Sequence, residues 1–485
     1  MNKLKTFITQ FNLLLIFSIA SLPSIARVVP SNLISDGMVL QQQAEVCLWG
    51  TAKPAAKVVV APSWAKKKIT AKTDSQGRWS ISLATPGASH TPYEIRLSDP
   101  DTTVIIKNVL IGEVWMACGQ SNMDMRLRGS YNCPVEGASE TIATAAAHAI
   151  RVFTVPRHTS LHPQTDTKGG KWAVSSPATA PDFSAMGYYF AETLEQTLNV
   201  PVGIITVAAG GTYIEGWMDA NWLKGFSTFR TDSASIMQIK RDYCRPVVFY
   251  NAMMHPVEPY TVRGFVWFQG ESNVGQQGAS YAQMMARMVK EWRARRHNEA
   301  LPFYYGELSP FCYSGTQKDK APFLREQQYR AQSLIPHSGM VGTSDVAASY
   351  ECANVHFKNK RTVGQRLGWM ALNETYGFKG IPCRGPEYDH MEALDNAVKL
   401  YFRYVERGFS RLCQIEGFEV AGEDRVFYPA DSVLVDKRKN FITVASSAVD
   451  HPVAVRYGFH DFPNCNMGGT ALLPMIPFRT DDWEE

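Results

Sequence analysis

The chain has 485 residues, of which 45% are hydrophobic and 19% are charged. This composition is that of a folded globular protein and excludes a disordered chain, and the length predicts two or three packed units rather than one core. The formal net charge of +4 is spread along the sequence without a long basic run. We therefore expect no nucleic-acid partner.

The first residues have the pattern of a secretory signal. Lys3 and Lys5 precede an apolar run at 13–20, and the small residues Ser24 and Ala26 stand at the minus-three and minus-one positions of a cleavage after Ala26. Because signals of this kind are cut after small residues, we assign 1–26 as the signal peptide. We expect an exported protein, periplasmic or extracellular, without stable membrane insertion; an uncleaved anchor is the alternative.

Nine cysteines are scattered over the chain, and no two of them form a Cys-x-x-Cys pair. This spacing does not suggest a zinc site, and we expect no metal. An exported chain can hold disulfides, but the odd number leaves at least one thiol unpaired, and the sequence does not define the pairing.

Residues 27–108 contain short stretches in which apolar and polar side chains alternate. Examples are 45–49, 57–60 and 79–83, with turn residues between them. Alternation with a period of two at this spacing predicts a small antiparallel β-sandwich.

From residue 109 to about 380, buried strands alternate with helices. The stretch 109–117 is nearly all apolar, as strands covered on both faces of a parallel sheet are. We therefore predict a doubly wound α/β domain, in which functional residues lie just beyond the carboxyl ends of the strands. Further strands are expected at 202–208, 264–268, 303–308 and 340–343, and helices at 186–198, 281–296 and 360–376.

Residues 381–485 begin with one more amphipathic stretch, at 393–405, and continue with strand-like segments at 441–444 and 452–457. The strand-like segments predict a β-rich region that packs on the other units. We expect its role to be structural.

Two turns rich in small residues follow predicted strands. Ser121 comes soon after the strand at 109–117, where a serine at the start of a helix exposes its hydroxyl and offers its own N–H to an oxyanion. Gly210 and Gly211 follow the strand at 202–208, and adjacent glycines let a ligand approach the backbone closely. Taken singly, each turn is more often structural than functional.

Two polar groups follow later strands. Gln269 to Asn273 form a dense cluster whose amides can complete an oxyanion hole and whose Glu271 can order the loop; the alternative is a polar loop that caps a helix. His356 lies just before the helix expected at 360–376 and can act as the general base of a serine. His255 is a weaker candidate, because no comparable polar setting follows it.

In their order and setting, these pieces resemble the sequence blocks of sialate O-acetylesterases. That family belongs to the SGNH hydrolases, which have a flavodoxin-like fold, and is related to esterases that act on plant polysaccharides. The resemblance covers nearly the whole mature chain. The similar segments are 33–42, 119–123, 210–212, 267–273, 354–356 with 359–360 and 363–367, and 477–483.

The resemblance implies an acyl-enzyme mechanism that needs no metal and no organic cofactor. His356 would take the proton of Ser121, whose oxygen attacks an acetyl carbonyl, and water would then release acetate. Backbone N–H groups and one side-chain amide would meet the oxyanion. The groups implied are Ser121 with Gly210 or Gly211 for the backbone and Gln269 or Asn273 for the amide, supported by Gln120 and Glu271.

The chain departs from the family at the third member of the catalytic triad. SGNH hydrolases commonly carry an Asp three residues before the histidine, and many sialate esterases carry one two residues before it. Here these places hold Ala353 and Asn354. Asp345 or Glu351 could orient the imidazole instead, or a backbone carbonyl could serve a Ser–His dyad. Loss of the orienting acid alone weakens a serine hydrolase without abolishing it.

The substrate implied by the resemblance is an acetylated sugar, either sialic acid or a plant polysaccharide such as acetyl-xylan. Specificity is expected in the loops after Gly211 and Asn273 and around 130–135. Two functions of other classes stay open, a noncatalytic carbohydrate-binding protein and a structural protein of the cell envelope. Neither accounts for a serine, two glycines, an amide cluster and a histidine at successive strand ends. The sequence defines neither the sugar nor the oligomeric state.

Overall fold

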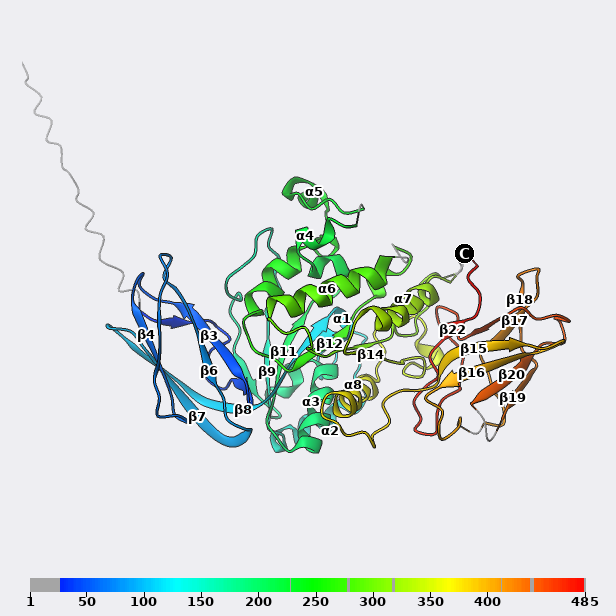
Figure 1. Cartoon of the computed structure of the whole chain (residues 1–485), viewed down its shortest axis with the longest axis horizontal. Helices are drawn as coiled ribbons and strands as arrows, with labels where there is room; N and C mark the ends of the chain where they lie inside the picture. Colours follow the sequence, from blue (N-terminus) through cyan, green and yellow to red (C-terminus); the bar gives the residue numbers. More distant parts are fainter. Residues whose placement is uncertain are drawn as a thin grey trace, which may run out of the picture.

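The computed structural model describes residues 27–226, 228–276, 280–315, 319–410, 412–436 and 440–483. The predicted signal peptide lies outside the described residues. A β-rich N-terminal unit, a central α/β unit and a β-rich C-terminal unit follow one another along the long axis of the molecule (Figure 1). None of the described helices is long and apolar enough to cross a bilayer.

The N-terminal unit consists of two groups of strands. Their inward residues share one core, as β6 (Arg78–Ala84) illustrates, because Trp79, Ile81 and Leu83 are buried while the residues between them are exposed. One sheet joins β1 (Val29–Pro30), β3 (Glu45–Thr51) and β6. The other strands are β2 (Val39–Gln41), β4 (Lys57–Pro62), β5 (Ile69–Lys72) and β7 (Ser89–Ser98).

A single long strand, β8 (Thr103–Gly119), connects the N-terminal and central units. Its first half pairs with β7 in antiparallel fashion, and its second half pairs in parallel with β11 (Val202–Ala208) and β12 (Gly264–Phe268). The predicted domain boundary at 108/109 therefore falls inside a continuous strand. This continuity holds the central sheet directly on the N-terminal unit.

The central sheet has the strand order β10-β9-β11-β8-β12-β13-β14. All neighbours on this path are parallel except β10, which runs antiparallel to β9 at one edge. The predicted α/β class is thus confirmed, with a mixed rather than purely parallel sheet. The remaining strands are β9 (Ile150–Thr154), β10 (Trp172–Val174), β13 (Phe303–Gly306) and β14 (Ser338–Val341).

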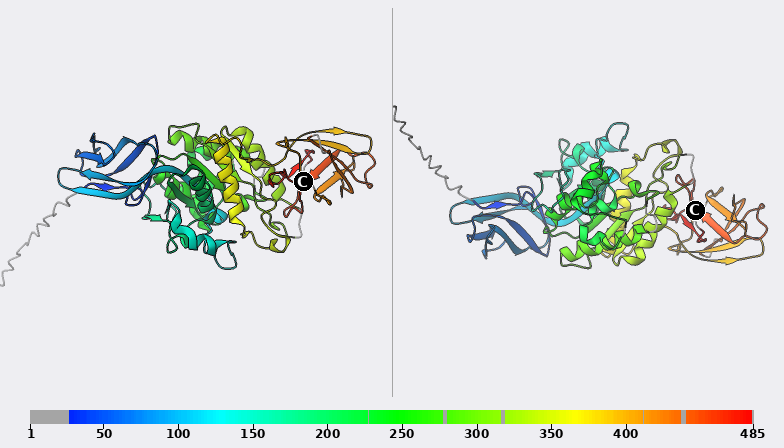
Figure 2. Two further views of the ribbon diagram at one scale, coloured as in Figure 1. Left: turned by 90° about the horizontal axis from the view of Figure 1, so that it is seen from below. Right: turned by 90° about the horizontal axis from the view of Figure 1, so that it is seen from above.

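Helices cover both faces of the central sheet (Figure 1; Figure 2). On one face lie α3 (Ala185–Leu198) and α8 (Lys360–Glu374), and on the other lie α6 (Tyr281–Arg295) and α7 (Ala321–Leu334). Trp267 of β12 packs in the core shared with α6, whereas Phe268 packs in the core shared with α3 and α8. Burial on both faces explains why this strand is an unbroken apolar run. The short helices are α1 (Ser121–Asp124), α2 (Ala138–Thr144), α4 (Ala220–Leu223) and α5 (Ser233–Gln238).

The C-terminal unit is β-rich, as expected, and contains two four-stranded sheets. The amphipathic stretch at 393–405 forms a turn and a strand, in which Val398, Leu400 and Phe402 are buried with a period of two. The first sheet comprises β15 (Glu387–Ala393), β16 (Val398–Arg403), β20 (Phe441–Ala445) and β19 (Ser432–Val435). The second comprises β18 (Phe427–Pro429), β17 (Phe418–Ala421), β21 (Ala454–Tyr457) and β22 (Phe478–Arg479).

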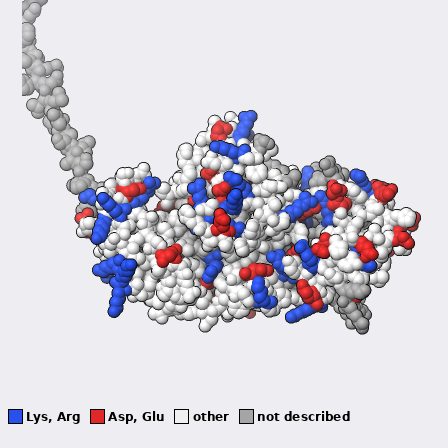
Figure 3. Space-filling view, in the orientation of Figure 1, with Lys and Arg blue, Asp and Glu red and all other residues white. Residues whose placement is uncertain are grey.

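Charged side chains of both signs are interspersed over the face of the molecule seen in Figure 3. One cluster of basic side chains stands out on the N-terminal unit, and acidic side chains are frequent on the C-terminal unit. This face carries no extended field of one sign.

Candidate active site

Ser121 is the first residue of α1 and follows the carboxyl end of β8, a central strand of the sheet. The turn before it requires a glycine: Gly119 has φ +143°, and a Cβ there would lie 2.0 Å from the carbonyl oxygen of Phe268. The turn is therefore packed tightly against the end of β12. This close approach fixes the half-buried Ser121 at the edge of the sheet.

The side chain of Gln120 ties the same turn to the chain leaving β12. Its Oε1 accepts hydrogen bonds from Nε2 of Gln269 at 3.0 Å and from the N–H of Gly270 at 3.2 Å. Gln120 is almost fully buried, so these bonds are shielded from water. They hold the backbone that carries Ser121 in one position.

The Gly210–Gly211 turn after β11 faces Ser121. A Cβ on Gly210 would lie 3.4 Å from the Cβ of Ser121, and Gly211 has φ +78°. Among the described residues, the backbone N–H groups of Ser121, Gly210 and Gly211 have no hydrogen-bond acceptor. Unpartnered N–H groups beside a hydroxyl are the chemical requirement for receiving an oxyanion.

The amides of Gln269 and Asn273, expected to supply a further donor, are engaged elsewhere. Besides Gln120, Nε2 of Gln269 donates to the carbonyl of Thr212 at 3.1 Å and to Oδ1 of Asn273 at 2.8 Å. Nδ2 of Asn273 donates to Glu215 at 3.2 Å, and both amide residues are 1% exposed. These two amides therefore stabilise the turns around Ser121 and Thr212, and their N–H groups are not directed toward a substrate.

His356 lies on the loop between η9 (Ser349–Glu351) and α8 and is half-buried. Its backbone N–H donates to Oδ1 of Asn354 at 3.0 Å, and its ring Nδ1 lies 3.4 Å from Sγ of Cys133. In the described part of the chain the hydroxyl of Ser121 makes no hydrogen bond, including none with His356. Catalytic hydrogen bonds of unliganded enzymes often form only when substrate binds.

Asn122 connects the segments that carry Ser121 and His356. Its Nδ2 donates to the carbonyl of Val355 at 3.1 Å and also to a carboxylate oxygen of Glu271. Its Oδ1 accepts from Nζ of Lys360, whose ammonium also lies 3.6 Å from the centre of the Phe357 ring. One fully buried amide thus links the residue after Ser121 to the residue before His356.

The groups bonded to Asn122 are buried and titratable. Burial raises the pKa of the Glu271 carboxyl, while Asn122 and the charge of Lys360 oppose the rise. Burial also lowers the pKa of the Lys360 ammonium to about 7, against the opposing charge of Glu271. Burial and the nearby Lys360 together lower the pKa of His356. His356 therefore stays neutral at neutral pH, which is the form that can accept a proton.

Neither candidate for the orienting acid hydrogen-bonds to His356. Both carboxylate oxygens of Asp345 accept hydrogen bonds from the guanidinium of Arg366 at 2.6 Å. Glu351 accepts from the backbone N–H of Ala348 at 2.9 Å. The nitrogen Nδ1 of His356 faces the thiol of Cys133 instead.

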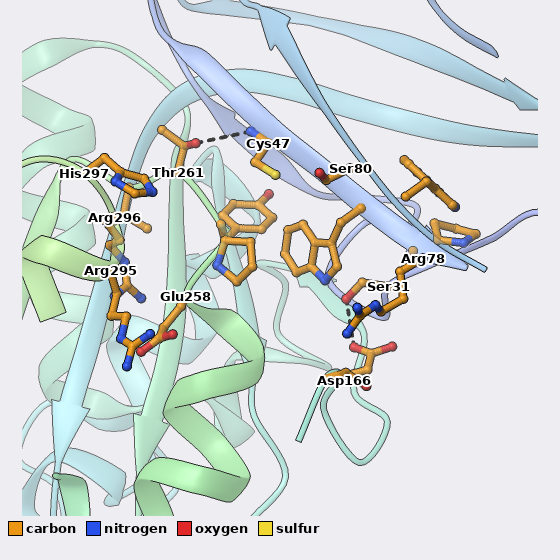
Figure 4. Close-up of a pocket in the computed structure, with 18 of the residues that line it drawn as sticks. Ser31, Cys47, Arg78, Ser80, Asp166, Glu258, Thr261, Arg295, Arg296 and His297 are labelled. Carbon is orange, nitrogen blue, oxygen red and sulfur yellow. Dashed lines mark hydrogen bonds between the residues drawn. The ribbon is translucent and has the colours of Figure 1, made fainter. Parts of the chain in front are cut away.

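A cavity of about 1450 Å³ lies away from this arrangement. Figure 4 shows Arg295 and Glu258 on one of its walls and Arg78 and Asp166 on the opposite wall. Its lining includes the loop that enters β12, whereas Ser121 lies where β8 ends, so the two are at opposite ends of the parallel strands. Within the described ranges, no group of three His, Cys, Asp or Glu side chains could hold a metal ion.

Comparison with known proteins places the chain among carbohydrate esterases. The family described as "Carbohydrate esterase, sialic acid-specific acetylesterase" matches residues 111–373. The crystal structure of a carbohydrate acetylesterase from Xanthomonas citri is 32% identical, with a TM-score of 0.84, and the match covers 94% of this chain and 100% of that one. The chain belongs to this esterase family.

Curated relatives of the esterase are similar over nearly their full length. The sialate O-acetylesterase of Mus musculus is 27% identical over 92% of this chain and 93% of its own. That of Homo sapiens is 26% identical over 92% of this chain and 91% of its own. The similarity therefore extends over all three units of the esterase.

Three residues around the candidate pair were not predicted as site residues. Asn122 directly follows Ser121, and Lys360 lies four positions after His356, so each had a local signal in the sequence. Cys133 had none, because its contact with His356 joins positions far apart in the chain.

Proposed function

We propose that the esterase is an exported serine hydrolase that removes O-acetyl groups from sugars through an acetyl-enzyme intermediate. The observation that carries the proposal is the set of three unpartnered backbone N–H groups, those of Ser121, Gly210 and Gly211, beside a serine hydroxyl at the carboxyl end of the sheet. A hydroxyl next to such donors is suited to attack a carbonyl and to hold the oxyanion that forms.

In the proposed mechanism, Oγ of Ser121 attacks the acetyl carbonyl while His356 takes its proton. The N–H groups of Ser121 and Gly210, with Gly211 next to them, stabilise the tetrahedral oxyanion, and one such donor is typically worth about 3 kcal/mol. His356 then gives the proton to the departing sugar oxygen. Water attacks the acetyl-enzyme with His356 again as base, and acetate leaves.

We propose that the pair works as a Ser–His dyad without a carboxylate on the imidazole. Asp345 is held by Arg366 and Glu351 by its own turn, so neither is free to orient His356 in this structure. The thiol of Cys133 takes the place next to Nδ1. A thiol is a weaker hydrogen-bond partner for the imidazole than a carboxylate is, so we expect a slower enzyme than one with a full triad.

We propose an acetylated sugar as the substrate, sialic acid or a related sugar first and an acetylated xylan second. Sialate O-acetylesterase is the name of the curated mammalian relatives, and the similar Xanthomonas citri structure is a carbohydrate acetylesterase. Two exposed aromatic residues support a sugar ligand: Tyr131, 91% exposed, and Tyr350, 76% exposed. Tyr131 adjoins Asn132, whose carbonyl accepts a hydrogen bond from Asn354 in the His356 loop at 3.2 Å.

Three structural proposals accompany this function. The central unit is of the SGNH type, which its strand order and the serine at the end of a central strand support. The two N-terminal groups of strands form a β-sandwich, which their shared core supports. Residues 1–26 direct export, on the basis of their sequence pattern alone.

The experiment that tests the proposal measures acetate release by the purified mature chain. The substrates are 4-nitrophenyl acetate, O-acetylated sialic acid and acetylated xylan, and the variants are Ser121→Ala and His356→Ala. We expect release by the wild type and a loss of at least about a thousandfold in each variant. Binding of the acetylated sugars without release by the wild type would favour the carbohydrate-binding alternative.

A further inference from the structure

Two cysteines, Cys312 and Cys352, come together beside the loop that carries His356. Cys312 lies after β13, and Cys352 directly follows η9, four positions before His356. The backbone N–H of Cys312 donates to the carbonyl of Cys352 at 2.9 Å, which places the two cysteines side by side. The side chain of Cys312 is exposed to solvent.

This arrangement fits the geometry that a disulfide requires. A direct backbone hydrogen bond between two residues brings their Cα atoms roughly into the range of about 4.4–6.8 Å that disulfides bridge. Burial, and then the neighbouring thiol of Cys352, raise the pKa of Cys312, as expected where two thiols share one site.

We infer that Cys312 and Cys352 form a disulfide when the esterase meets an oxidising compartment, and that this bond clamps the His356 loop. The oxidant is a low-molecular-weight or protein disulfide. One cysteine thiolate attacks it and releases the first thiol, and the second cysteine attacks the mixed disulfide and releases the other. Two electrons pass to the incoming disulfide, and the two protons of the cysteines end on the released thiols.

A disulfide between Cys312 and Cys352 would restrict the movement of the loop that carries His356. Residues Ser349, Tyr350 and Ala353 of this loop are exposed to solvent. Because no carboxylate orients His356, its position depends on how well its loop is held. A covalent bond to the chain after β13 restricts the loop in the folded state and reduces the freedom of the unfolded chain.

The test uses the full mature chain, purified without reductant and then equilibrated with oxidised glutathione. Free thiols are alkylated, the protein is digested, and the peptides are identified by mass spectrometry. We expect a cross-linked peptide joining Cys312 to Cys352 in the wild type and in the control Cys413→Ser, whose exposed cysteine lies in the C-terminal unit. The cross-link is expected to be absent in Cys352→Ser.

The same proteins are compared by thermal unfolding with and without dithiothreitol. Reduction should lower the Tm of the wild type and of Cys413→Ser by about 5 °C, and should leave Cys352→Ser unchanged. Complete alkylation of both cysteines after oxidation, or a cross-link between other cysteines, would overturn the inference. The peptide map is independent of esterase activity, so failure of the disulfide and failure of the proposed reaction are distinguishable.

Discussion

Sγ of Cys133 lies 3.4 Å from Nδ1 of His356, on the side of the imidazole where serine hydrolases place a carboxylate. The opposite nitrogen, Nε2, is left to meet a serine. A thiol in this place can fix the direction of the ring but cannot stabilise the imidazolium by charge. A substitution that places a carboxylate beside Nδ1 of His356 should therefore supply the missing negative charge.

Cys133→Asp is expected to raise kcat for 4-nitrophenyl acetate by about tenfold near pH 8, because a carboxylate beside Nδ1 stabilises the imidazolium that forms during attack. The same charge raises the pKa of His356, so the acidic limb of the pH–kcat profile should move to higher pH. The matched control is Cys133→Ser, which adds no charge and should leave the limb in place. An unchanged profile in Cys133→Asp would contradict this role.

Lys360 is expected to set the pH range of the reaction. His356 acts as base only when neutral, and burial together with Lys360 lowers its pKa. Activity should therefore rise with pH through a midpoint below the ordinary histidine value of about 6.5 and be retained above it. In Lys360→Met, the loss of the positive charge should move this midpoint to higher pH.

The control for Lys360 is Lys358→Met, which removes an exposed lysine hydrogen-bonded to Tyr350 and should not move the midpoint. Lys360→Arg keeps the charge and serves as the second variant, since Lys360→Met also leaves Glu271 buried without its partner and should lower the Tm. A midpoint that stays in place in Lys360→Met would rule out the electrostatic effect.

Gly210→Ala is expected to reduce kcat/KM by about a hundredfold with little change in Tm, because the methyl group would crowd the space between the Gly210 N–H and Ser121. The added Cβ makes only an ordinary 3.4 Å contact with Ser121, so the fold should tolerate it. In Gly119→Ala, by contrast, the Cβ would meet the Phe268 carbonyl oxygen at 2.0 Å, and we expect a poorly folded protein. Wild-type kcat/KM in Gly210→Ala would remove this turn from the oxyanion hole.

Tyr131→Ala is expected to raise KM for acetylated sugars about tenfold while leaving kcat/KM for 4-nitrophenyl acetate unchanged, because a stacked aromatic ring contributes to sugar binding and not to the chemistry. Tyr428→Ala, on an exposed tyrosine of β18 in the C-terminal unit, is the control and should change neither value. An equal loss of kcat/KM on both substrates would instead indicate that Tyr131 stabilises the structure of the site and does not bind the sugar.

The sequence predicts the central strands well because burial on both faces makes them continuous apolar runs. The segments 202–208 and 264–268 have the same bounds in the structure as β11 and β12. The strand β9 was missed because Arg151 interrupts its apolar run; this buried guanidinium donates to the carbonyl of Gly37 at 3.0 Å and to the side chain of Asn108 at 2.8 Å.

The helix α7 was missed for a related reason. Its buried face includes Arg325 and Gln328, whose side chains satisfy backbone carbonyls and N–H groups in the core rather than pack as apolar residues. An apolar period of 3.6 is therefore weak in this helix. A helix whose buried face carries polar side chains with distant partners cannot be recognised from the spacing of its apolar residues.

The candidate site likewise has residues that the sequence predicts and contacts that it does not predict. Ser121 and Gly210 could be found because each follows a predicted strand, where α/β folds collect functional groups, and His356 because it directly precedes a predicted helix. The bonds of Asn122 to Lys360 and Glu271, and the contact of Cys133 with His356, join segments that only the folded chain brings together.

Covalent labelling tests the central claim most directly. The purified chain is treated with a phosphonofluoridate ester, which reacts with activated serines, and the modified residue is mapped by mass spectrometry in the wild type, Ser121→Ala and His356→Ala. We predict a single label on Ser121 in the wild type, none in Ser121→Ala, and labelling slowed by at least about a hundredfold in His356→Ala. A label on another serine, or equal labelling rates in the wild type and His356→Ala, would contradict the assignment of Ser121 and His356 as nucleophile and base.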